Sequence, residues 1–79
     1  MNRDEESAKL RALRGGPRFA AVPFSVSYHC CFEATVLDTS KGDDGSDRPY
    51  FETIAECFTW ADADVIVRAL NKMPAEEFE

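Results

Sequence analysis

The segment Phe24–Val36 reads FSVSYHCCFEATV and alternates with a period of two. The positions on one face of such an alternation are Phe24, Val26, Tyr28, Cys30, Phe32, Ala34 and Val36. Those on the other face are Ser25, Ser27, His29, Cys31, Glu33 and Thr35. Alternating side chains of this kind are typical of a β-strand with one buried face. The segment therefore predicts a long strand that begins after Pro23, with Phe19–Val22 as a short extension before it.

A second strand is predicted for Tyr50–Phe58, which begins after Pro49. Between the two strands, Asp38–Arg48 is rich in Asp, Ser and Gly and has no apolar periodicity, which predicts a loop. An antiparallel hairpin with a long acidic tip is the simplest way to join these segments. Within the second strand, Glu52 and Glu56 are predicted to share one face.

A helix is predicted at each end of the chain. The C-terminal helix begins at Thr59 as N-cap, with Asp62 at the third helical position. Its predicted sheet-facing stripe is Ala61, Val65, Ile66, Ala69, Leu70 and Met73. The N-terminal helix, Asn2–Arg14, has Asn2 as its candidate cap and only a thin apolar stripe, so it is predicted to be marginal.

These elements predict a small α+β domain, with a small antiparallel sheet, a C-terminal amphipathic helix on one face and the marginal N-terminal helix. A chain of 79 residues fits one domain. The predicted divisions are a helical or flexible segment 1–18, the α+β domain 19–74 and an acidic tail 75–79. Neither an apolar run of about 20 residues nor a signal peptide is present, so we expect a cytoplasmic protein without a membrane partner.

The net charge of −6 lies wholly between Asp38 and Asp64, which hold eight acids and two bases. An acidic protein is poorly suited to binding a phosphate backbone directly, because such binding needs clustered Lys and Arg. A single-sign cluster is suited to a basic protein surface, although it also serves as a solvated face. We therefore expect a basic protein partner and no direct contact with nucleic acid.

The conventional candidates for catalysis or metal binding are His29, Cys30, Cys31 and Cys57. Their spacing lacks the paired CxxC pattern of a zinc site, and no further acid or amide is placed to orient the imidazole. The cysteines are therefore predicted to be reduced thiols packed in the core. Glu52 and Glu56, about 13 Å apart on a strand, are too far apart for a glycosidase pair. No enzymatic activity, metal or cofactor is expected.

Trp60 has two interpretations, a packing residue at the end of the sheet or an anchor for a partner. The acids of the loop and of the second strand have few bases to compensate them. The predicted partner-binding residues are Asp43, Asp44, Asp47, Glu52, Glu56, Trp60, Asp62 and Asp64.

Residues 54–71, IAECFTWADADVIVRALN, resemble the strand-to-helix ending of small phage and prophage proteins. In size, acidity and architecture the chain is similar to anti-CRISPR proteins of mobile elements. That resemblance implies a non-enzymatic inhibitor that acts in the host cytoplasm. It also implies that acidic groups, in the manner of a DNA mimic, dock on the basic nucleic-acid-binding surface of a multisubunit CRISPR effector complex and block DNA binding. The alternative is a structural, assembly or regulatory protein that homodimerises through a sheet edge.

Overall fold

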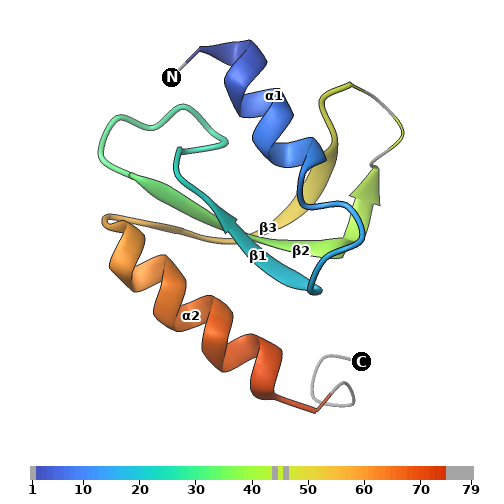
Figure 1. Ribbon diagram of the computed structural model, residues 1–79. Helices are drawn as coiled ribbons and strands as arrows, with labels where there is room; N and C mark the ends of the chain where they lie inside the picture. Colours follow the sequence, from blue (N-terminus) through green and yellow to red (C-terminus); the bar gives the residue numbers. More distant parts are fainter. Residues whose placement is uncertain (1, 44, 46, 75–79) are drawn as a thin grey trace.

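The computed structural model describes residues 2–43, 45 and 47–74. The elements are α1 (Arg3–Arg11), β1 (Phe19–Val22), β2 (Ala34–Asp43), β3 (Tyr50–Cys57) and α2 (Trp60–Lys72). The strands form one antiparallel sheet in the order β1-β2-β3. Helix α1 packs on one face of this sheet and α2 on the other (Figure 1). The predicted α+β fold, with a C-terminal helix on one face, is confirmed.

The core below α1 joins the helix to all three strands. Its buried members are Leu10, Val22, Phe24, Leu37 and Phe51. Leu10 is the main apolar contribution of α1, and it is only 3% exposed. Since packing supplies most of the stability of a short helix, this one side chain explains how α1 forms despite its thin apolar stripe.

The core on the opposite face lies between the sheet and α2. Its buried members are Ala34, Val36, Cys57 and Ala63, and Ile66, Val67 and Leu70 pack against them. The predicted stripe was wrong at Ala61, Val65, Ala69 and Met73, which are exposed. The observed set has the spacing i, i+3, i+4, i+7, and at its start Ala63, fully buried, meets the sheet.

The strand predicted for Phe24–Val36 was wrong over most of its length. Strand β2 begins only at Ala34, and residues 23–33 form the connection that reverses the chain between β1 and β2. Side-chain hydrogen bonds replace the expected ladder, for example from the Val26 N–H to Thr35 Oγ1 at 3.2 Å.

The loop predicted for Asp38–Arg48 is shorter in the structure, because β2 continues to Asp43. Asp38 is buried and forms an ion pair of 3.1 Å with Arg18. Burial alone would raise the pKa of the Asp38 carboxyl, but hydrogen bonds from Arg18 and Ser40, with the charge of Arg18, hold that pKa below its ordinary value. Asp38 is thus a structural acid and contributes little to an accessible charged surface.

Both predicted helix starts are confirmed. The Asn2 side chain accepts the N–H of Glu5 at 2.8 Å, and Thr59 Oγ1 accepts the N–H of Asp62 at 3.2 Å. Neither helix in the described part of the chain is long and apolar enough to cross a membrane. The predicted acidic tail 75–79 lies outside the described residues, and the division between 1–18 and 19–74 stays a prediction.

Candidate partner-binding surface

Two predicted acids of the β2–β3 hairpin tip, Asp43 and Asp47, lie at the end of β2 and in the turn before β3. Asp43 pairs with Tyr50 in the sheet register, and its carboxylate accepts the Gly45 N–H at 2.9 Å. The Asp47 side chain is exposed, while its backbone carbonyl accepts a hydrogen bond of 2.6 Å from Arg11. Asp44 lies outside the described residues. Asp43 and Asp47 are accessible, but they are at the opposite end of β3 from the N-terminus of α2 (Figure 1).

Glu52 and Glu56 lie on opposite faces of the sheet, so the predicted common face was wrong. Glu52 is paired with Asp38 and Glu56 with Thr35. Directly paired residues of an antiparallel sheet share a face, and an odd separation along one strand changes the face. The cause is an irregularity between the Val36 and Leu37 pairs, which leaves Ile54 as an extra residue in β3.

The Glu56 carboxylate is occupied by hydrogen bonds within the protein. Its carboxylate accepts hydrogen bonds from the hydroxyls of Ser25 at 2.5 Å and Ser27 at 2.7 Å, and from the Ser27 N–H at 3.3 Å. Partial burial would raise the pKa of Glu56, but these hydrogen bonds, with one from Thr35, lower it below its ordinary value. Glu56 is therefore poorly available to a partner.

Trp60, Asp62 and Asp64 lie together at the N-terminus of α2. Trp60 is 47% exposed, which favours the anchor interpretation over packing. Among the described residues, no base lies within ion-pair distance of the Asp62 carboxylate. The Asp64 carboxylate, by contrast, forms an exposed ion pair of 2.7 Å with Arg68. Asp62 is thus the freer of the two acids.

Two large apolar side chains beside Asp62 are exposed to solvent. Phe58 is 65% exposed and Val65 is 66% exposed. Together with Asp62 they line a shallow groove of ≈ 410 Å³ between the end of β3 and α2. The sequence analysis missed both, since it placed Phe58 within the second strand and assigned Val65 to the core stripe. The exposure of Val65 could have been inferred from the sequence, because Val65 lies outside the i, i+3, i+4 pattern of apolar residues that begins at Ala63.

A second hollow adjoins this groove through the ring of Phe32. The ring centroids of Phe32 and Phe58 are 5.2 Å apart. Phe32, Trp60 and Glu33 line an open hollow of ≈ 590 Å³. We call the exposed set Phe58, Trp60, Val65, Asp62 and Glu33 the Phe58 surface.

The sequence predicted that the cysteines pack in the core, and this was wrong for two of the three. Cys57 is buried between the sheet and α2, but Cys30 and Cys31 are exposed. Burial raises the pKa of the Cys57 thiol, and the Asp62 carboxylate raises it further. Cys57 is therefore a poor nucleophile, while the adjacent pair lies in the loop next to the Phe58 surface.

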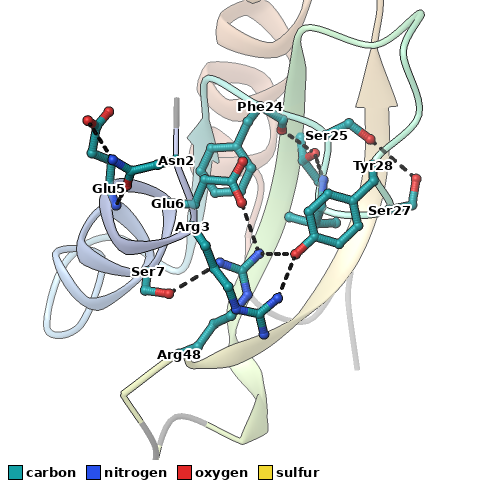
Figure 2. A network of polar contacts seen from close by, with 12 residues as sticks. Asn2, Arg3, Glu5, Glu6, Ser7, Phe24, Ser25, Ser27, Tyr28 and Arg48 are labelled. Carbon is teal, nitrogen blue, oxygen red and sulfur yellow. Dashed lines mark hydrogen bonds and ion pairs between the residues drawn. The ribbon is translucent and has the colours of Figure 1, made fainter.

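Arg48 links the β2–β3 hairpin to α1 and to the β1–β2 connection. Its guanidinium donates to Glu6 at 3.3 Å, to Ser7 at 3.2 Å and to the Tyr28 hydroxyl at 3.2 Å (Figure 2). Arg3 donates to the same hydroxyl at 3.4 Å. This base of the acidic region is therefore engaged with α1 and with Tyr28.

No known protein family, curated protein or solved structure matches the chain. The functional proposal therefore depends on the side chains described above.

Proposed function

We propose that the protein is a non-enzymatic binding protein that docks on a basic surface of a partner protein through the Phe58 surface. The observation that carries this proposal is the exposure of two sets of side chains: Phe58 and Val65, which line one groove with Asp62, and Trp60, which lines the adjoining hollow with Glu33. Aromatic anchors surrounded by polar groups are typical of binding hot spots. Carboxylates beside them favour a partner rich in Lys and Arg.

Charge supports a basic partner over a neutral one. The chain has a net charge of −6, and among the described residues neither Asp62 nor Glu33 has a base within ion-pair distance. A field of one sign speeds the encounter with an oppositely charged surface, and it disfavours partners of like charge. The other predicted acids, Asp43, Asp47 and Glu52, are exposed and extend the negative field along β3.

The partner we propose is the nucleic-acid-binding surface of a multisubunit CRISPR effector complex, within the host cytoplasm. This choice rests on the resemblance in size, acidity and architecture to anti-CRISPR proteins. Occupation of the basic surface by the Phe58 surface would exclude target DNA, since both would neutralise the same Lys and Arg side chains.

The proposal is tested by adding the protein to a purified effector complex with its target DNA and measuring DNA binding by gel shift. We expect co-elution with the complex in gel filtration and loss of DNA binding. Phe58→Ala and Trp60→Ala should each weaken inhibition by roughly 30-fold, the effect of a hot spot of about 2 kcal/mol.

Tyr50→Ala is the matched control, because Tyr50 is an exposed aromatic residue at the opposite end of β3. We expect this variant to inhibit as the wild-type protein does. Unchanged DNA binding at saturating wild-type protein would rule out the CRISPR effector as partner. Equal losses for Phe58→Ala and Tyr50→Ala would instead place the contact elsewhere.

A second candidate function is homodimerisation through the edge of β3. The outer edge of β1 is closed at Phe19, whose N–H and C=O both hydrogen-bond to the Asn71 side chain. Strand β3 is the other edge strand, and in the described part of the chain no further backbone hydrogen bond covers its outer side. An uncovered edge invites pairing with a second strand.

Sedimentation velocity over a range of protein concentrations tests this second function. A dimer that Ile54→Lys converts to a monomer would support it, because Ile54 is an exposed residue of the edge strand. A monomer at every concentration would exclude it.

A further inference from the structure

Cys30 and Cys31 occupy the corner of a tight turn in the β1–β2 connection. The Phe32 N–H donates to the His29 carbonyl at 3.2 Å, which closes a four-residue turn with the two cysteines at its central positions. Both thiols are exposed, and their sulfur atoms are 3.9 Å apart. The turn therefore places two thiols side by side, although the residues are adjacent in the chain.

The imidazole of His29 completes a cluster with these thiols. One ligand atom from each of His29, Cys30 and Cys31 lies within 4.8 Å of the other two. His29 Nδ1 faces the turn, where its lone pair accepts the Cys31 N–H at 3.2 Å, and a bound ion would displace this hydrogen bond. The imidazole also packs against the Phe32 ring in a tilted arrangement, with 4.7 Å between ring centroids, and Phe32 in turn contacts Phe58. These contacts place the imidazole beside the two thiols, and metal binding exchanges the Cys31 hydrogen bond for a bond to the ion.

We propose that His29, Cys30 and Cys31 bind a thiophilic metal ion, Zn²⁺. Two Zn–S bonds of about 2.3 Å at a tetrahedral angle separate the sulfur atoms by about 3.8 Å, and the observed separation is 3.9 Å. The imidazole supplies a third ligand, and the exposed side leaves the fourth position to water or to a side chain of a partner. Each thiol releases its proton to solvent as the ion binds.

The loop around the cluster is built to hold this arrangement. Tyr28, directly before His29, has φ of 62°, a conformation that is costly for a bulky residue. The backbone of His29 is held by the Ser25 hydroxyl, which accepts the His29 N–H at 2.9 Å and donates to Glu56. The carboxylate of Glu33 lines the same hollow as His29 and Cys30, and its negative charge favours a cation there. The three proposed ligands all lie in the His29–Phe32 turn, so metal binding does not require the proposed docking function.

The direct test is titration of the fully reduced protein with Zn²⁺ in competition with a chromogenic chelator. We expect one Zn²⁺ per chain and no response to Mg²⁺, which prefers oxygen ligands. Cys31→Ser and His29→Ala should each lower the affinity at least about tenfold, as the loss even of an outer-shell partner commonly does. Because all three side chains are exposed, these variants should keep the wild-type circular dichroism spectrum.

Cys57→Ala is the matched control, since it removes a thiol that is buried on the α2 side of the sheet. It should bind Zn²⁺ as the wild-type protein does. Substitution with Co²⁺ gives a second readout, because thiolate-to-cobalt absorption should appear in the wild-type protein and disappear in the Cys30→Ser/Cys31→Ser variant. Absence of Zn²⁺ binding by the reduced wild-type protein, or equal binding by the double variant, would overturn the proposal.

Discussion

Ser25 donates a hydrogen bond of 2.5 Å to the Glu56 carboxylate and joins the β1–β2 connection to the edge strand β3. The same hydroxyl oxygen accepts the His29 N–H at 2.9 Å, and Ser27 adds two further hydrogen bonds to Glu56. A single carboxylate thus fixes a connection that has no regular secondary structure. This connection holds the two exposed cysteines and adjoins the Phe58 surface, so Glu56 positions both candidate sites.

We predict that Glu56→Ala lowers the free energy of unfolding by about 1.5–3 kcal/mol, because it leaves several donors without their charged acceptor. Urea denaturation measures the change. Glu52→Ala, at an exposed position on the same strand, should change the free energy of unfolding by less than about 0.5 kcal/mol. Equal effects of the two substitutions would contradict the structural role of Glu56.

Acid should destabilise the protein through Glu56 and Asp38, whose pKa values both lie below their ordinary values of 4.5 and 3.8. In acid the unfolded chain then binds more protons than the folded chain, so the free energy of unfolding rises with pH. This contribution is fully present above about pH 4.5 and is lost as the pH falls through the folded pKa values. Urea titrations between about pH 7 and pH 3 should show the loss, and Glu56→Gln should flatten it.

The packing of α1 on the sheet makes Leu10 a critical residue. Leu10→Ala should lower the free energy of unfolding by about 2–5 kcal/mol, since Leu10 is buried in the core below α1. Lys9→Ala, on the exposed side of the same helix, is the control and should have little effect. A small effect of Leu10→Ala on urea denaturation would show that α1 is not part of the cooperative unit.

Gly42 allows β2 and β3 to approach closely beyond the register shift that follows Asp38. Its φ is 104°, and an added Cβ would collide with the carbonyl oxygen of Tyr50 and lie 2.9 Å from the Cα of Phe51. Gly42→Ala should therefore destabilise the protein by about 2 kcal/mol or more. Gly16→Ala is the control, because its new Cβ would make an ordinary contact of 3.4 Å. Thermal unfolding of both variants distinguishes strain at Gly42 from a general effect of replacing glycine.

Local signals allowed the sequence to predict both helix starts. The Asn2 and Thr59 caps each depend on a hydrogen bond to a residue three positions later, and such a bond is encoded within one turn of chain. The alternation in Phe24–Val36 was misleading, because the reversal of the chain depends on contacts of Ser25 with the distant Glu56. Tertiary contacts of this kind leave no periodic signal.

The candidate surface was only partly predictable for the same reason. Trp60 and Asp62 were identified from their place at the start of α2. Val65 was missed because its exposure depends on how α2 is rotated against the sheet, where Ala63 is the buried residue. Phe58 was missed because β3 ends one residue before it. The opposite faces of Glu52 and Glu56 follow from one extra residue in β3, which alternation alone does not reveal.

The three thiols should differ in reactivity. Cys30 and Cys31 are exposed, whereas Cys57 is buried and its thiol pKa is raised by burial and by Asp62. Thiolate is the reactive form, so an aromatic disulfide reagent at neutral pH should modify Cys30 and Cys31 rapidly and Cys57 only after unfolding. Mass spectrometry of the partly modified protein identifies the sites, and Cys57→Ala should abolish the slow phase alone. Rapid modification of Cys57 in the folded protein would contradict its burial between the sheet and α2.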